Sequence, residues 1–92
     1  MRAHKIQSID TALRLYYENE ELSNADIREL FGDIAQSTIA KMKNEVLAVM
    51  TERKTQRWRY HTVNTEVAYE VWGINVESLE RRRAKLIKLG MM

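Results

Sequence analysis

Polar residues able to hydrogen-bond a base edge are concentrated between residues 36 and 44, and the candidates for base contacts are Gln36, Ser37, Lys41 and Asn44. Glutamine and asparagine amides can form two hydrogen bonds to an adenine edge, and serine is a versatile partner. Lysine suits a guanine edge or a phosphate. A merely solvated helix face would also be polar, but it is more often rich in glutamate and lysine. The segment therefore favours base recognition over a solvated surface.

Basic residues concentrate in the second half of the chain. The net charge is +2, but residues 1–50 carry six Lys and Arg against eight Asp and Glu, whereas residues 51–92 carry nine against five. A basic half suggests nucleic acid or an acidic partner, although this excess alone also fits a solvated surface. The candidate phosphate contacts are Arg57, Arg59, Arg81, Arg82, Arg83, Lys85 and Lys88.

Residues for catalysis or metal binding are scarce. The histidines, His4 and His61, lack a paired carboxylate at helical spacing, and no Ser/His/Asp order, phosphate-binding glycine loop or metal-ligand cluster is present. The chain has no cysteine, which excludes disulfides and fits a reducing cytoplasm. No apolar run approaches the roughly 20 residues of a membrane-spanning helix. We therefore expect a cytoplasmic protein that is not an enzyme, with no cofactor, metal or membrane partner.

The local patterns predict helices throughout the first half of the chain. The absence of proline and the presence of only three glycines favour an all-α fold. Apolar residues at three- and four-residue steps predict a first helix from about Ser8 to Asn19. A second helix begins at Ser23, which forms a capping box with Asp26. It ends at Gly32, where glycine can adopt a left-handed C-cap without steric penalty.

A third, long helix is predicted to start immediately after this glycine. Asp33 is a suitable N-cap, and Gln36 three residues later completes a second capping box. The apolar stripe of this helix consists of Ile39, Met42, Val46 and either Val49 or Met50. The opposite face contains Ser37, Lys41, Asn44 and Ala48.

Residues 52–63 form a basic linker or arm of ambiguous conformation. Arg57 and Arg59 alternate with Trp58 and Tyr60, which suggests an extended segment, but no second strand is identified to pair with it. An extension of the third helix fits equally well. The arginines could contact phosphates or a minor groove, or they could be solvated while Trp58 packs on the core.

Residues 64–92 repeat the arrangement of helix, glycine turn and helix. Asn64 caps one predicted helix, Gly73 and Ile74 form the turn, and Asn75 caps a basic final helix.

The second and third helices resemble the helix-turn-helix signature of bacterial regulators and homeodomain-like domains. The match is carried by Ile27, Leu30, Phe31, Gly32, Ser37, Thr38 and Ile39. The turn is one residue longer than the commonest form. The resemblance implies that the third helix enters the DNA major groove. By position, it implies that the residues facing the groove are Gln36, Ser37, Ala40, Lys41 and Asn44.

Residues 68–79 are also similar to a helix-turn-helix, of the excisionase and mercury-regulator types, with a turn closer to the common length. This unit departs from the pattern at Glu77 and Glu80, because carboxylates near phosphates are unfavourable. Arg82 also occupies a position where an apolar residue normally packs inward. We interpret the final helix as a phosphate clamp or a dimer element, rather than as a second recognition helix.

Together, these patterns predict an all-α fold with four to five helices. A three-helix bundle with a helix-turn-helix is expected in residues 1–51, followed by the arm in 52–63 and a second helix-turn-helix-like hairpin in 64–92. The expected function is sequence-specific binding of double-stranded DNA by a small bacterial or mobile-element transcriptional regulator, acting as a homodimer or with both units along one site.

Two alternatives fit the same patterns. One is a protein-interaction module, such as an anti-repressor or assembly adaptor, that docks a protein partner through the C-terminal hairpin by an exposed Trp72 or by Met91 and Met92. The other is the DNA-recognition small subunit of a phage terminase.

Overall fold

The computed structural model describes residues 6–56, 59 and 61–90. The described part has the order α1 (Ile9–Glu18), β1 (Glu21–Leu22), α2 (Asn24–Phe31), α3 (Gln36–Arg53), β2 (Val63–Asn64), α4 (Thr65–Val71) and α5 (Val76–Lys88). The prediction of an all-α fold with four to five helices is confirmed, with one small sheet added. None of these helices is long and apolar enough to cross a membrane.

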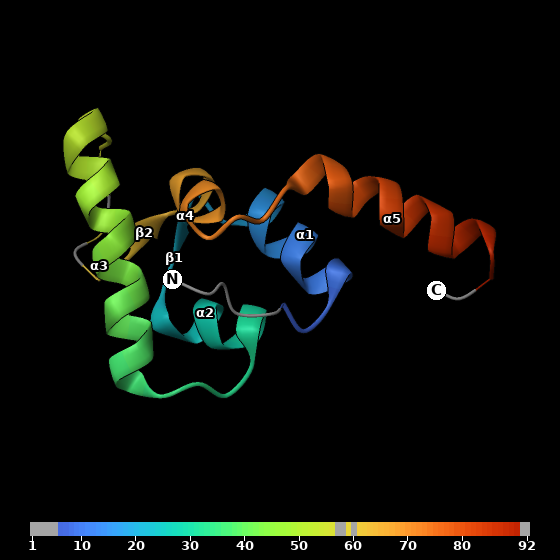
Figure 1. Cartoon of the computed structure of the whole chain (residues 1–92), viewed down its shortest axis with the longest axis horizontal. Helices are drawn as coiled ribbons and strands as arrows, with labels where there is room; N and C mark the ends of the chain where they lie inside the picture. Colours follow the sequence, from blue (N-terminus) through green and yellow to red (C-terminus); the bar gives the residue numbers. More distant parts are fainter. Residues whose placement is uncertain (1–5, 57–58, 60, 91–92) are drawn as a thin grey trace.

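The helices surround one elongated core. Figure 1 shows α3 at one end of the molecule and α5 extending from the other, with α1, α2 and α4 between them. The principal extents are 42 × 26 × 23 Å. A continuous cluster of buried hydrophobic side chains reaches from Ala12 in α1 to Leu79 in α5. The helical units predicted for residues 1–51 and 64–92 share this core, and α3 crosses the expected boundary because it continues to Arg53.

Three helix starts are fixed by the predicted capping residues. The Ser23 hydroxyl accepts from the Asp26 N–H, and the Asp26 carboxylate accepts from the Ser23 N–H at 2.9 Å, which completes the capping box. The amide oxygens of Asn64 and Asn75 accept from backbone N–H groups three residues later, at 3.0 and 2.9 Å. Each cap satisfies a first-turn donor that has no partner within its helix.

The predicted capping box of Asp33 and Gln36 is wrong. The N-cap of α3 is Ala35, which makes no side-chain capping bond, and the helix begins at Gln36. The Gln36 amide oxygen instead accepts from the Arg28 guanidinium at 2.7 Å, a charge-assisted bond that draws the side chain toward α2. Four residues separate α2 from α3 and four separate α4 from α5. Counted from the glycine, three residues lie between Gly32 and α3 and two lie between Gly73 and α5, so the first turn is one residue longer on that count.

The sequence identifies no strand that could pair with the arm, and this prediction is wrong for the last residue of the arm, Val63. Val63 pairs with Leu22 and Asn64 pairs with Glu21 in an antiparallel ladder, and the Thr65 N–H donates to the Glu20 carbonyl at 3.0 Å. A strand of two residues carries too little periodicity to be recognised in the sequence.

Gly32 ends α2 in a conformation that is nearly limited to glycine. Its φ is positive, as predicted, but φ 94° and ψ −167° lie outside the left-handed helical region. A Cβ atom at this position would lie 2.6 Å from Nε2 of Gln7. That nitrogen donates to the Phe31 carbonyl at 3.0 Å, so the added atom would disturb a bond that ties the N-terminal segment to α2.

We predict that Gly32→Ala lowers the free energy of unfolding by about 1–3 kcal/mol, because alanine is strained in this conformation. Urea unfolding followed by circular dichroism measures the loss. Gly73→Ala is the matched control, since Gly73 has φ 75° and no atom within 4 Å of a built Cβ. We expect a smaller loss at Gly73, and equal losses would contradict the role assigned to the Gln7 contact.

Candidate nucleic-acid interface

The long helix α3 has one face in the core and one face open to solvent. Its inward stripe, at most 2% exposed, consists of Ile39, Met42, Val46 and Met50. Its outward face consists of the exposed residues Ser37, Ala40, Lys41, Asn44 and Ala48. The residues predicted from the sequence to share a face therefore do share one, and Lys41 is the charged residue among the five. The acids Glu45, half-buried, and Glu52, exposed, follow Lys41 and Ala48 by one turn.

The start of α3 is open to a negatively charged ligand. Because Ala35 offers no side-chain cap, the first-turn N–H groups of α3 receive no capping oxygen from that residue. Gln36 is exposed at this end and is held by Arg28 from α2. Backbone donors at a helix N-terminus, combined with a nearby guanidinium, can hold a phosphate oxygen.

A shallow hollow of about 300 Å³ borders the exposed face. Lys43 lies in this hollow, and its ammonium donates to the Asn24 amide oxygen at 2.9 Å and to the His61 carbonyl at 2.7 Å. Lys43 thus joins the start of α2 and the end of the arm to α3. Sequence reasoning missed this residue, because its partners lie 19 and 18 positions away along the chain.

A buried carboxylate anchors the arm at Arg59. Glu21 is 4% exposed, and its Oε1 accepts from the Arg59 N–H at 3.0 Å and from the Thr62 hydroxyl at 2.7 Å. The Arg59 side chain remains 61% exposed, with Nε 3.5 Å from the same oxygen. A terminal guanidinium nitrogen also donates to the Glu21 carbonyl at 3.4 Å, so both the backbone and the guanidinium of Arg59 contact Glu21 although most of the side chain is exposed. The predicted phosphate contact Arg57, with Trp58 and Tyr60, lies outside the described residues.

The far end of α3 offers less positive charge than its sequence suggests. Arg53 donates to both carboxylate oxygens of Glu70 in α4, at 2.7 and 2.8 Å. The hydrogen bonds and the charge of Arg53 lower the pKa of Glu70, and Glu70 raises the pKa of Arg53. This pair ties α3 to α4 and offsets one cation.

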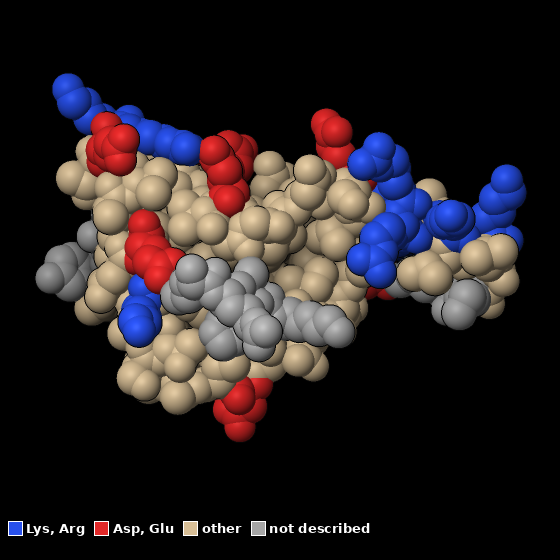
Figure 2. Space-filling view, in the orientation of Figure 1, with Lys and Arg blue, Asp and Glu red and all other residues tan. Residues whose placement is uncertain are grey.

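The cations of α5 lie at the opposite end of the molecule from the α3 face. Figures 1 and 2 show α5 extending away from the body and Lys and Arg side chains gathered over it. Arg83 pairs with Asp10 of α1, whereas the other cations on the exposed surface of α5 are Arg81, Arg82, Lys85 and Lys88. The structure thus ties the arm to α3 at His61, two residues after Arg59, but does not bring the α5 cluster there.

Trp72 is a core residue, so the expectation of an exposed docking tryptophan is wrong. It is 5% exposed, and its indole N–H donates to the Met42 carbonyl at 3.4 Å. Its ring also meets that of Phe31 edge to face, with centroids 5.4 Å apart. Because Trp72 joins the second hairpin to α2 and α3, it cannot serve a partner. Met91 and Met92 lie outside the described residues.

Comparison with models of protein families, with curated proteins and with solved structures finds no match. The function is therefore inferred from the geometry of the chain itself.

We predict that Glu21→Ala lowers the free energy of unfolding by about 1–3 kcal/mol, because it removes the acceptor of the part-buried Arg59 N–H and the closer of the two acceptors of the buried Thr62 hydroxyl. Amide hydrogen exchange should accelerate at Arg59 and Val63, as measured by NMR. Glu20→Ala is the matched control, since Glu20 is adjacent and exposed. Its effect should stay within about 0.5 kcal/mol, and unchanged exchange at Arg59 in Glu21→Ala would contradict the anchoring role.

Proposed function

We propose that the protein binds double-stranded DNA sequence-specifically through α3, as a small transcriptional regulator of a bacterium or mobile element. The observation that carries this proposal is the exposed polar face of α3, which lies opposite a fully buried stripe. An α-helix with side chains is about 10–12 Å wide and fits the roughly 12 Å major groove. The small residues Ala40 and Ala48 would let the helix backbone approach the base edges closely.

The base contacts are assigned to the polar residues of this face. Asn44 and Gln36 would each form paired hydrogen bonds to an adenine, and Lys41 would bond a guanine edge. Ser37, in the first turn, would contact either a base or a phosphate. Gln36 is oriented by Arg28 from the preceding helix, which supports a role near the point where α3 enters the groove.

Phosphate contacts are assigned to groups that border the face. Arg59 has an anchored backbone and a mostly exposed side chain, so a guanidinium N–H that does not bond Glu21 could bond a phosphate while the backbone stays in place. The N–H groups at the start of α3 would bond a second phosphate. Such contacts fix the register of the protein on the duplex, whereas the base contacts provide specificity.

The α5 cluster is not assigned to the same contact. The molecule is 42 Å long, and α5 and α3 lie at opposite ends of it (Figure 1). A phosphate clamp by α5 would therefore act on a part of the DNA well away from the bases that α3 contacts. We assign α5 a separate role, which is developed below.

We predict that Lys41→Ala combined with Asn44→Ala reduces discrimination between the preferred site and unrelated DNA by at least about tenfold, because each base contact contributes about 1–3 kcal/mol. The site is first selected from a random DNA pool, and affinities for it and for scrambled DNA are measured by fluorescence anisotropy. Both side chains are exposed, so helicity should not change.

Lys85→Ala is the matched control, because it removes the same charge from an exposed position in α5 that takes no part in the proposed base contacts or in the dimer contact proposed below. It should leave discrimination intact. Equal discrimination by the double variant and the wild type would overturn the assignment of α3 as the recognition helix. Failure to enrich any site from the pool would instead favour the protein-interaction module.

The salt dependence of binding provides a second prediction. The logarithm of affinity should fall linearly with the logarithm of salt concentration, with a slope near −0.9 for each phosphate contacted. Arg59→Ala should reduce the magnitude of that slope by about one unit. A slope near zero in the wild type would contradict DNA binding through phosphates.

A further inference from the structure

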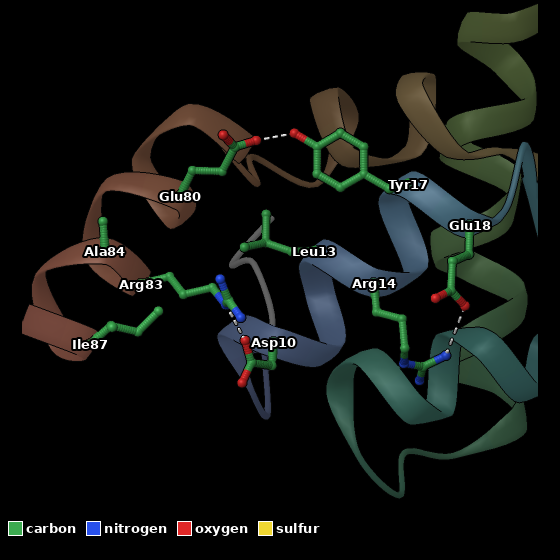
Figure 3. Close-up of a pocket in the computed structure, with 9 residues that line it drawn as sticks. All are labelled: Asp10, Leu13, Arg14, Tyr17, Glu18, Glu80, Arg83, Ala84 and Ile87. Atoms are coloured by element: carbon green, nitrogen blue, oxygen red, sulfur yellow. Dashed lines mark hydrogen bonds and ion pairs between the residues drawn. The ribbon is translucent and has the colours of Figure 1, made fainter. Parts of the chain in front are cut away.

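A hollow between α1 and α5 presents apolar side chains to solvent. It has a volume of about 640 Å³, and Leu13, Ala84 and Ile87 line it. Figure 3 shows Leu13 of α1 and Ile87 of α5 directed into this space. Two large side chains that line it are exposed, Tyr17 by 65% and Ile87 by 48%, and Leu89, two residues after Ile87, is 65% exposed. Exposed apolar side chains gathered at one place indicate an interaction surface.

Only the first part of α5 packs against the body. Leu79 is its buried residue, and Val76 packs on the core from the first turn. Two side-chain contacts with α1 hold the helix in place, Glu80 to Tyr17 and Arg83 to Asp10 (Figure 3). The hydrogen bond from Tyr17 to Glu80, followed by partial desolvation, raises the pKa of the tyrosine. Beyond these contacts α5 extends away from the body (Figure 1).

Charge is segregated along α5. Glu77 and Glu80 are the acids of the helix and lie near its start, whereas residues 81–88 contain five Lys and Arg and no acid. Two parallel copies of this helix would place like charges together. Two antiparallel copies place the acidic start of each against the basic end of the other.

We propose that α5 pairs antiparallel with α5 of a second copy of this chain, so that the protein is a two-fold dimer in the absence of DNA. Along α5 the exposed residues Glu77, Glu80, Ala84 and Ile87 follow one another at steps of three, four and three residues, which is the spacing of a helix-pairing seam. The last three of them border the hollow toward α1. Ala84 is exposed and small, so it permits close approach near the middle of the contact. A second hollow, of about 350 Å³, lies beside Glu77 and Ala84.

The register of the pair follows from these charges. A two-fold axis between residues 82 and 83 places Glu77 of each copy opposite Lys88 of the other. Both side chains are exposed, and within the described part of the chain neither of them forms an ion pair. Because a two-fold contact is self-complementary, this pair forms twice.

The partner assigned to α5 is a second copy of the chain, because the acidic end and the basic end that would pair both lie on this one helix. An unrelated partner would need to supply its own acidic and basic ends in reverse order, whereas a two-fold axis does so automatically. A helix of 13 residues is about 20 Å long, so the contact lies at the small end of stable interfaces. Dimerisation should therefore depend on protein concentration.

The experiment is sedimentation velocity on the purified chain without DNA, over a concentration series. We expect a monomer–dimer equilibrium in the wild type. Glu77→Lys should raise the dimer dissociation constant by about tenfold or more, since two symmetry-related pairs change from attraction to repulsion. Lys88→Glu should do the same, and the chain carrying both substitutions should regain the wild-type constant.

Glu66→Lys is the matched control, because Glu66 is an exposed acid in the first turn of α4, as Glu77 is in α5. It makes the same change in net charge and should leave dimerisation unchanged. Circular dichroism of each variant verifies that the fold is retained. A wild-type monomer at every concentration, or single variants that dimerise as well as the wild type, would overturn the proposal. A double variant that stays monomeric would also overturn the register.

This inference is independent of the proposed DNA binding. The chain with both Lys41→Ala and Asn44→Ala should dimerise like the wild type, so failure of one proposal leaves the other intact.

Discussion

The burial of one stripe of α3 is the constraint on which the rest of the structure depends. Ile39 and Val46 are fully buried, and elements from both halves of the chain contact this helix. The Trp72 indole bonds the Met42 carbonyl, and the backbone N–H of Asn64 approaches the Met50 sulfur at 3.4 Å. With this stripe held from several directions, rotation of α3 about its axis would expose apolar surface and bury Lys41 and Asn44. The orientation of the outer face is therefore set by the core.

A second constraint fixes the arm. Glu21 and the short β1–β2 ladder connect parts of the chain about 40 residues apart. Buried carboxylates are unfavourable unless they are hydrogen-bonded, so the placement of Glu21 depends on the donors of Arg59 and Thr62. In return, this carboxylate holds the end of the arm, with Lys43 as a further link to α3. The arm thus borders the proposed recognition helix as a consequence of packing and not of its own sequence.

In the proposed arrangement, one end of the molecule, at α3, recognises DNA and the other end, at α5, contacts a second copy. Two copies joined through α5 would place their α3 faces on the order of 60 Å apart, because each copy is 42 Å long and the paired helices overlap by about 20 Å. That separation is closer to two turns of DNA than to one. The position of the basic cluster, remote from α3 and next to exposed Ile87, is explained better by helix pairing than by a contact shared with α3.

The sequence by itself determined the features that depend on neighbouring residues. The capping box of Ser23 and Asp26, the caps at Asn64 and Asn75 and the two faces of α3 were predictable, since each involves residues only a few positions apart. Tertiary structure decided the rest. Gln36 bonds Arg28 instead of completing the predicted capping box, Glu21 is buried, and Trp72 packs inward. These outcomes depend on contacts between segments that are distant in the chain. Such contacts contribute to the free energy of folding only when the core forms and brings the segments together.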